Sequence, residues 1–217
     1  KVCAIVFSKD RPFQLSQYLR TLFSYSVGVK LEVIVLAKIE KAFDDGYAAV
    51  AREYPQVNLI RETHFRVDFS SIMESVRSKD FIMFGVDDAL FCSHIPWCDA
   101  IAVLGGHDNV QCVHLKLSPG VCFCHPATSP QAEPSFRMLP GGNIVVFEAG
   151  KGTHDWNYPF DLCGSLFRGR TIRDMISKLA SNPASLTHPN SFEAEGQAAF
   201  RAVFDDASAA DAAAASS

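Results

Sequence analysis

The first ninety residues alternate between short apolar runs and segments with helical periodicity, and this alternation constrains the fold more than any other feature. The apolar runs predict strands over residues 2–7, 31–37, 57–62 and 81–86. The segments between them predict helices over residues 13–25, 43–54 and 69–78. Strands that are apolar on both faces and alternate with helices indicate a mainly parallel sheet covered by helices on both sides.

The alternation weakens after residue 88. We expect a helix over residues 95–104, a strand over 110–117 and a long loop rich in Pro, Gly and Ser over 118–142. A further strand is predicted over residues 142–149 and a helix over 171–180, and the Ala-rich tail from residue 207 is expected to fray.

The composition narrows the function classes. In a chain of 217 residues, 48% are hydrophobic, which is enough apolar surface to form a core and excludes disorder over most of the length. The formal net charge of −4 argues against broad binding of nucleic acid or an anionic membrane. No apolar run is long enough to cross a bilayer, and the first residue, Lys1, suggests a piece of a longer multidomain chain.

The sequence has seven cysteines, an odd number without regular spacing, which favours reduced thiols over a set of disulfides. We therefore expect a soluble protein of a reducing, cytoplasmic compartment in preference to a secreted protein. Structural zinc is the alternative, because two short segments combine Cys with His. They contain Cys92, His94 and Cys98, and Cys122, Cys124 and His125. Neither has zinc-ribbon spacing, so packed thiols are favoured.

In parallel sheets, ligands bind outside the carboxyl ends of the strands. The loops at residues 8–12 and 86–90 follow the first and fourth strands, so we expect them to share one crevice with the segment that follows the third strand. Asp87 and Asp88 place two like charges there, which a hard cation such as Mg²⁺ or Mn²⁺ compensates. The alternative is an ordinary Asp-rich turn.

The loop Ser-Lys-Asp-Arg-Pro, residues 8–12, brings Asp10 and Arg11 to the same crevice. Asp10 can accept hydrogen bonds from a base or a ribose, and Arg11 can pair with phosphate. The alternative is a polar turn with an exposed salt bridge. Neither GxGxxG nor GxxxxGK[ST] occurs in this loop, which argues against dinucleotide-dependent redox chemistry and P-loop hydrolysis.

Two segments, IVFSKDRPFQLSQYLRTL and FIMFGVDDALF, together resemble nucleotide-sugar-dependent glycosyltransferases of the GT-A fold, of the bacterial and viral glycosyltransferase-like group. The resemblance covers about residues 2–200. It implies a Rossmann-like α/β domain over 1–206, with a mixed, mainly parallel sheet and a low-complexity tail over 207–217. Its nucleotide-binding half is about 1–92 and its acceptor half about 93–206.

The resemblance assigns donor-binding roles by position. Ser8, Asp10 and Arg11 fall where the base and the ribose are contacted, and Arg66 or Asp68 falls where relatives place further donor-contacting side chains.

The family's acidic motif, DxD, is here Val86-Asp87-Asp88, so that Val86 replaces the first acid. The last acid is the usual metal ligand, which makes Asp88 the expected ligand of Mn²⁺ or Mg²⁺. Asp87 is then available for the ribose or a metal-bound water.

A C-terminal segment, HDWNYPFDLCGSLFR, resembles the acceptor side of the same group, in which an acid often precedes the Gly. Cys163 occupies that position, and Asp161, two residues earlier, is the candidate catalytic residue. It is the base if the transfer inverts the configuration, and it stabilises the oxocarbenium-like centre if the transfer retains it. The later HPNSFE matches a second recurring stretch, in which Asn190 and Glu193 shape the site or cap a helix.

The expected function is metal-dependent transfer of a sugar from a UDP- or GDP-linked donor to a hydroxyl of a glycan or glycoprotein. A non-catalytic sugar- or nucleotide-binding module is the main alternative, favoured by Val86 and Cys163. A nucleotidylyltransferase is disfavoured because a Gly-rich loop is missing after the first strand.

Overall fold

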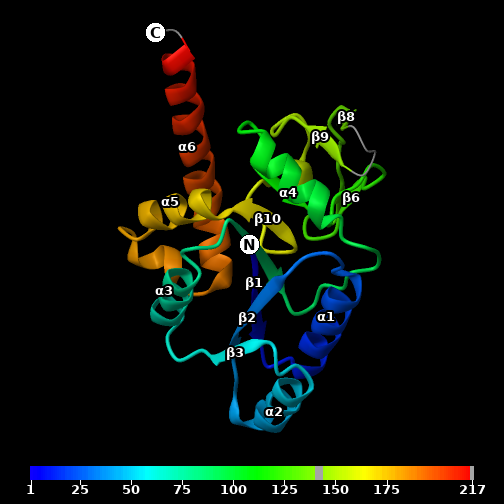
Figure 1. Cartoon of the computed structure of the whole chain (residues 1–217), viewed down its shortest axis with the longest axis vertical. Helices are drawn as coiled ribbons and strands as arrows, with labels where there is room; N and C mark the ends of the chain where they lie inside the picture. The colour runs from blue at the N-terminus through cyan, green and yellow to red at the C-terminus, as the bar shows by residue number, and fades with distance from the viewer. Residues whose placement is uncertain (140–143, 216–217) are drawn as a thin grey trace.

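The computed structural model describes residues 1–139 and 144–215, whose elements are shown in Figure 1. The helices are α1 (Pro12–Tyr25), α2 (Asp44–Glu53), α3 (Phe65–Ser75), α4 (Trp97–Gly106), α5 (Gly169–Leu179) and α6 (Pro189–Ala215), with one-turn helices η1 (Lys41–Phe43), η2 (His154–Asn157) and η3 (Pro183–Leu186). The main-sheet strands are β1 (Val2–Lys9), β2 (Leu31–Lys38), β3 (Asn58–Arg61), β4 (Phe81–Val86), β5 (Cys112–His114) and β10 (Ser165–Arg168).

The six strands form one sheet in the order β3-β2-β1-β4-β10-β5. Strands β1 to β4 are mutually parallel, and β10 runs antiparallel to both β4 and β5. The prediction of a mixed, mainly parallel α/β sheet is confirmed. The return strand β10 was not among the predicted strands. It has only four residues, all of them buried, and follows a turn at Gly164, whose φ of +77° suits glycine.

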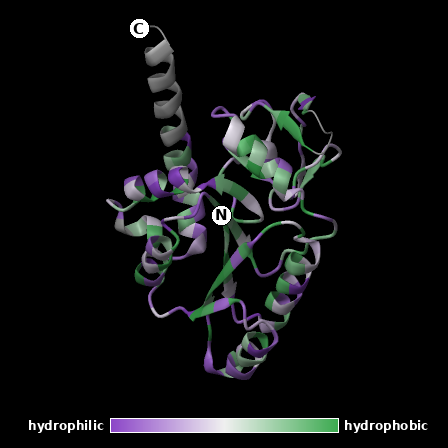
Figure 2. Cartoon of the chain, in the orientation of Figure 1, coloured by the Kyte–Doolittle hydropathy of each residue, from purple (hydrophilic) through white to green (hydrophobic). Residues whose placement is uncertain are grey.

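Side chains alternate between two cores, one on each face of the sheet. Phe7 of β1 packs with Phe65 and Phe69 of α3, on the face that α3, α5 and α6 cover. Val6 lies on the opposite face, in the core formed with α1, α2 and α4. Figure 2 shows the central strands as hydrophobic and the outer helices as mixed. Apolar burial on both faces explains why these strands are continuous apolar runs.

The third helix begins at Phe65, four residues before the predicted start. The Asp68 carboxylate accepts hydrogen bonds from the backbone N–H groups of Thr63 and His64, at 2.7 and 2.8 Å. These bonds give hydrogen-bond partners to two backbone N–H groups just before the first helical turn. The periodicity of the apolar residues contains no signal for this earlier start of the helix.

The predicted loop over 118–142 contains short antiparallel pairs in the described residues. The strands are β6 (Phe123–Cys124), β7 (Ser129–Pro130), β8 (Phe136–Met138) and β9 (Val145–Phe147), pairing β6 with β7 and β8 with β9. The predicted strand over 142–149 is thus realised only as β9. The parts of both predictions that fall on residues 140–143 lie outside the described residues.

The backbone of α6 is helical as far as Ala215, although the sequence predicted a frayed tail from residue 207. Alanine has the highest intrinsic helix propensity, so a run of alanines extends a helix that a packed segment has begun. In Figure 1 this end of α6 projects away from the sheet.

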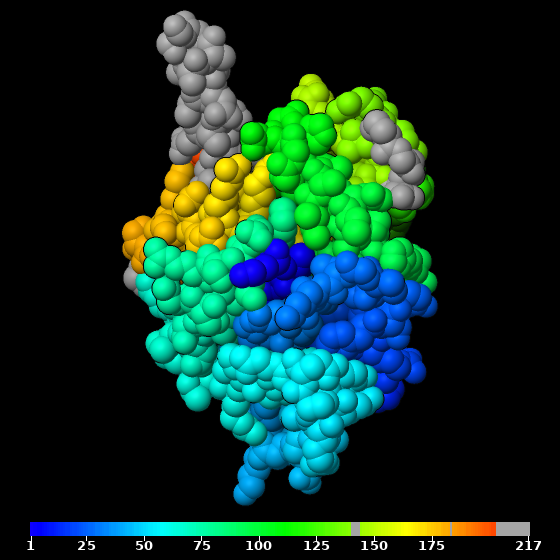
Figure 3. All heavy atoms as spheres, viewed as in Figure 1, coloured from blue at the N-terminus to red at the C-terminus, as the bar shows by residue number. Residues whose placement is uncertain are grey.

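The segment after β4 packs on the N-terminal half. Ile95 N–H donates to the Tyr25 carbonyl at 3.0 Å, and Phe91 N–H donates to Thr21 Oγ1 at 3.2 Å. Figure 3 shows the segment that follows β4, in green, in direct contact with the N-terminal part of the chain, in blue. In the part of the chain that the structure describes, no helix is long and apolar enough to cross a membrane.

Candidate functional site

The exit loops of β1 and β4 meet at the carboxyl edge of the sheet, as the strand order requires. Ser8 Oγ donates to Asp87 Oδ2 at 2.7 Å and lies 2.6 Å from Tyr47 Oη, which in turn accepts from Arg11 N–H at 3.1 Å. Lys9 N–H also donates to Asp87, at 3.2 Å. This buried network fixes the two loops relative to each other. Ser8 and Asp87 therefore hold the loops together, at positions where the sequence predicted contacts with the nucleotide-sugar donor.

Arg11 bridges the two consecutive acids. Its guanidinium nitrogen Nη1 is 2.8 Å from Asp88 Oδ2 and 3.6 Å from Asp87 Oδ1. The Arg11 and Asp88 side chains are about half exposed, whereas Asp87 is buried, and this burial raises the pKa of the Asp87 carboxyl above its ordinary value. Arg11 is thus a cation that already compensates the like charges at this edge.

Asp10 occupies a left-handed backbone conformation, with φ of +54°. Its Oδ1 accepts from Glu40 N–H at 2.7 Å, and its own N–H donates to the Lys38 carbonyl at 3.2 Å. Asp10 therefore joins the exit loop of β1 to that of β2, so that three strand ends are held together.

Arg66 and Asp68 lie on α3 and make contacts other than the predicted ones. Arg66 donates to the carbonyl of Ala180, just after α5, at 2.7 Å. Asp68 caps α3, and the backbone hydrogen bonds from His64 and Thr63 lower the pKa of its carboxyl. Neither side chain contacts Ser8, Arg11 or the acid pair through any interaction found in the described residues. Their roles in donor binding stay predictions.

The acid pair has the donor chemistry of a shared metal site. Asp88 offers an exposed carboxylate, and Mg²⁺ or Mn²⁺ takes one or two carboxylates and completes its shell with phosphate and water. Within the described residues, no three His, Cys, Asp or Glu side chains gather as a metal site, including the cysteine–histidine segments. The residues therefore fit an ion that a phosphate-bearing ligand helps to hold, once Arg11 releases Asp88.

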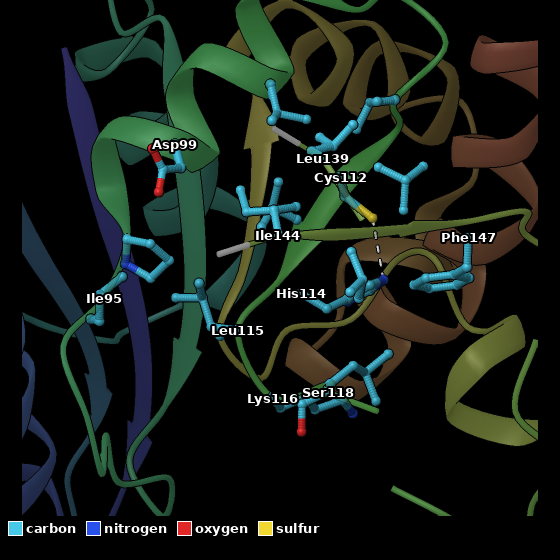
Figure 4. Close-up of a pocket in the computed structure, with 18 of the residues that line it drawn as sticks. Ile95, Asp99, Cys112, His114, Leu115, Lys116, Ser118, Leu139, Ile144 and Phe147 are labelled. Atoms are coloured by element: carbon cyan, nitrogen blue, oxygen red, sulfur yellow. Dashed lines mark hydrogen bonds between the residues drawn. The ribbon is translucent and has the colours of Figure 1, made fainter. Parts of the chain in front are cut away.

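A cavity of about 1550 Å³ begins directly after the acid pair, at Ala89 and Leu90. Its walls come from α4, β5, the strands β8 and β9, and the turn at Cys163 and Gly164. Figure 4 shows Ile95 and Asp99 on one side, and Lys116 and Ser118 at one end. This space lies where the resemblance places the acceptor half.

Asp161 does not line this cavity and is only 2% exposed, but its ion-pair partner Lys116 and its neighbour Cys163 both line it. Its Oδ1 accepts from Cys163 N–H at 2.5 Å, and its Oδ2 forms an ion pair with Lys116, whose ammonium is also 3.6 Å from Asp155. The candidate base is thus an enclosed carboxylate with both oxygens engaged. Its assignment as the base stays a prediction.

A neutral histidine lies next to that ion pair. His114 Nδ1 is 2.8 Å from Ser165 Oγ, and its Nε2 is 3.3 Å from Cys112 Sγ, the contact dashed in Figure 4. Burial lowers the pKa of His114 to about 4. The imidazole is therefore uncharged at neutral pH and leaves Lys116 as the cation of this cluster.

Cys163 lies in the wall of the cavity, near the carboxylates of both Asp88 and Asp161. Its thiol lines the cavity, and burial together with the nearby carboxylates of Asp161, Asp88 and Glu193 raises its pKa to about 11. The thiol at this wall of the cavity is therefore neutral at pH 7. The sequence reasoning identified Cys163, but it missed Lys116 and Tyr47, because each lies in a segment that reads as an ordinary strand or helix.

No family model matches the chain. It is similar to the bifunctional glycosyltransferase pgtA of Dictyostelium discoideum, with 28% identity over 214 residues, covering 88% of this chain and 27% of that protein. The chain thus spans about a quarter of the length of this relative.

Among solved structures, the fold is similar to that of S. aureus TarS. Residues 1–349 of TarS match with a TM-score of 0.51 and 13% identity, over 91% of this chain and 55% of that one. A longer TarS structure matches with a TM-score of 0.50 and 12% identity, over 92% of this chain and 34% of that one. At this identity the likeness concerns the fold alone.

The sheet order, the strand-end loops and the similarity to pgtA agree with the resemblance found in the sequence. The chain therefore has a GT-A-like fold and is similar in sequence to a glycosyltransferase.

Proposed function

We propose that the chain transfers a sugar from a nucleoside-diphosphate donor to an acceptor hydroxyl, at the edge where the exit loops of β1 and β4 meet. The observation that carries this proposal is the joining of these loops by the Ser8–Asp87 hydrogen bond and the Arg11–Asp88 ion pair. They form a charged cluster at the strand ends, directly before Ala89, where a large cavity begins. The similarity to a bifunctional glycosyltransferase supports the same reaction class.

In this proposal the donor's diphosphate lies beside Arg11 and Asp88, and the acceptor enters through the cavity that begins at Ala89. An acceptor oxygen attacks the anomeric carbon, the bond from that carbon to the phosphate oxygen breaks, and the nucleoside diphosphate leaves. Arg11 can bind phosphate oxygens in a bidentate manner when it leaves Asp88.

A divalent ion, held by Asp88 with Asp87 behind it, would supply charge neutralisation to the leaving diphosphate. The ion and Arg11 are alternative partners for the same carboxylate, so the metal requirement is a property to be measured.

On the acceptor side, a transfer that inverts the configuration needs a base for the hydroxyl proton. We retain Asp161 for this role. Its proton-accepting oxygen becomes available only when Lys116 moves. The fixed Asp161–Lys116 pair therefore requires a rearrangement on acceptor binding, and Glu193 is the alternative carboxylate near Cys163.

Calorimetric titration with UDP and with GDP, each with and without Mn²⁺, tests donor binding. We expect one of the two nucleotides to bind with a clear dependence on Mn²⁺ and to lose affinity in Arg11→Ala. Nucleotide release from UDP- and GDP-sugars then tests transfer, with water or a simple glycoside as acceptor. Binding of nucleotide without any turnover would favour the sugar- or nucleotide-binding module instead.

A further inference from the structure

Three ionic side chains form a row across the carboxyl edge of the sheet, on the face opposite Ser8. Lys9 of β1 pairs with Lys38 of β2 in the parallel register. Glu62 continues the ladder one residue beyond the pair of Ala37 with Arg61, and its N–H donates to the Ala37 carbonyl at 2.7 Å. Paired residues of neighbouring strands point to the same face, so these three side chains are neighbours.

Alternation along the strands places this row above the core that contains Phe7 and Leu36, beside the N-terminus of α3. Ser8 and Ala37 point to the other face, where Ser8 meets Tyr47. The side chains of the row therefore point away from the Ser8–Tyr47 side of the network that fixes Asp87, although the backbone N–H of Lys9 donates to Asp87 and so joins the two.

The Glu62 side chain is largely enclosed, but its carboxylate has few polar partners. Its side chain is only 12% exposed, and its nearest cation is Lys38, whose ammonium is 3.9 Å from Oε1. No donor among the described residues forms a hydrogen bond to this carboxylate. Burial raises the pKa of Glu62 above its ordinary value. The neighbouring Asp68 is the contrast, since its carboxylate accepts from two backbone N–H groups.

An enclosed carboxylate without hydrogen-bond donors is unfavourable, and a ligand that brings such donors relieves the cost. The two lysines beside it leave the row with a net positive charge and so suit a ligand that also carries negative charge. Lys38 is 61% exposed and free to turn towards such a ligand.

The strand order sets the span of that ligand. Glu62 follows β3 and Asp88 follows β4, three strands apart in the order β3-β2-β1-β4. With neighbouring strands about 4.8 Å apart, the two carboxylates are roughly 14 Å apart along the edge. An extended nucleoside diphosphate with its phosphates at Arg11 and Asp88 places its nucleoside over β2 and β3.

We propose, on the basis of the function proposed above, that Glu62 selects the nucleoside of the donor by accepting two hydrogen bonds from a pair of adjacent donors on it. Two parts of a nucleoside present such a pair. One is the 2′,3′-diol of the ribose, and the other is the N1–H and N2–H edge of guanine.

Calorimetry of the parent and of Glu62→Gln with UDP, GDP and their 2′-deoxy forms separates these sources. If the diol is bound, Glu62→Gln and the 2′-deoxy change each weaken binding at least about tenfold, and their effects do not add. If the guanine edge is bound, Glu62→Gln weakens the binding of GDP at least about tenfold and leaves the affinity for UDP within twofold of the parent. The 2′-deoxy change then has little effect on either affinity.

Glu32→Gln is the matched control. Like Glu62, Glu32 is a carboxylate with a lysine partner, Lys79, but it is more exposed and lies on β2 at the opposite edge of the sheet. The Glu32→Gln variant should bind every nucleotide as the parent does. Thermal melting of Glu62→Gln should be at or above that of the parent, because an unsatisfied charge is removed.

The outcomes separate this inference from the function on which it rests. A parent chain that binds nucleotide, together with a Glu62→Gln variant that binds all four ligands within twofold of it, overturns the role of Glu62 alone. A parent chain that binds none of the four overturns the donor site itself, and the role of Glu62 with it.

Discussion

Asp87 and Asp88 are consecutive, yet Asp87 is 5% exposed and accepts hydrogen bonds from Ser8 and Lys9, whereas the Asp88 side chain is 58% exposed and pairs with Arg11. The first acid is part of the structure that joins two loops. The second is available to a ligand. One sequence motif therefore contains two residues whose removal should have different consequences.

Removing Asp87 should cost stability, and removing Asp88 should not. Asp87→Ala leaves the Lys9 N–H and Ser8 Oγ without their carboxylate, which should lower the free energy of unfolding by about 1–3 kcal/mol. Asp88→Ala removes only an exposed ion pair and should stay within about 1 kcal/mol of the parent. Urea denaturation of both variants measures the difference, and equal losses would contradict it.

Asp88→Asn should abolish the part of nucleotide binding that depends on Mn²⁺ while the protein stays folded. A neutral amide is a weaker ligand for a hard cation than a carboxylate, and it also frees Arg11. Asp108→Asn is a suitable control, because Asp108 is an exposed acid paired with Arg170 at 3.0 Å. Calorimetry with and without Mn²⁺ reads the effect. Normal Mn²⁺-dependent binding by Asp88→Asn, together with a clearly lower melting temperature, would assign both acids to structure.

Much of the parallel half of the fold could be predicted, because its strands are buried on both faces and its helices are amphipathic. The limits of α3 and the existence of β10 could not. The start of α3 depends on one capping carboxylate, Asp68, and β10 is four residues long within a segment that has no clear period. Short strands that depend on their neighbours leave a weak pattern in the sequence.

For the candidate site, the sequence identified the strand-end residues because topology brings such ends together. It could not show how Ser8, Asp10 and Asp87 divide their hydrogen bonds between the loops, since these partners lie up to 79 residues apart. It also missed Glu62 and Lys116. Glu62 reads as the polar end of a strand, and the partner of Lys116 lies on another segment of the chain.

The stability of the protein should depend on pH through His114 of β5. Its pKa is lowered to about 4 in the folded protein, against 6.5 for an ordinary histidine. Between these values the unfolded chain binds a proton that the folded chain does not, so stability is fully present above pH 6.5 and falls as the pH drops towards 4. The loss from this group is at most about 3 kcal/mol.

His114→Gln should remove that component. The free energy of unfolding of each protein at pH 7 serves as its own baseline. Only the change in this free energy between pH 7 and pH 4 is compared between the variant and the parent. All other ionisable groups are common to both proteins, so the difference in slope isolates the imidazole. Urea denaturation at several pH values provides the measurement, and parallel curves would show that His114 is not protected from protonation.

Lys116 should stabilise the fold mainly by compensating Asp161. Lys116→Met leaves an enclosed carboxylate without its cation, which we expect to cost about 2 kcal/mol, less than for a fully buried pair because Lys116 is one-third exposed. Asp161→Asn in the same chain should recover most of that loss. A double-mutant cycle by denaturation measures the coupling. Additive effects of the two changes would mean that the ion pair contributes little.

The activity of Asp161→Asn decides whether this residue has a role beyond the ion pair. If Asp161 is the base, nucleotide affinity should stay near that of the parent and transfer should fall by roughly 10²-fold or more, the range of general acid–base groups. Cys163→Ser should be much milder, because a protonated thiol has only to pack there. Glu193→Gln is the informative comparison, since the Glu193 carboxylate accepts one hydrogen bond, from Leu162 N–H at 3.1 Å, and burial raises its pKa. Full turnover in Asp161→Asn with a large loss in Glu193→Gln would move the base to Glu193 and leave Asp161 as the partner that holds Lys116 and the Cys163 turn.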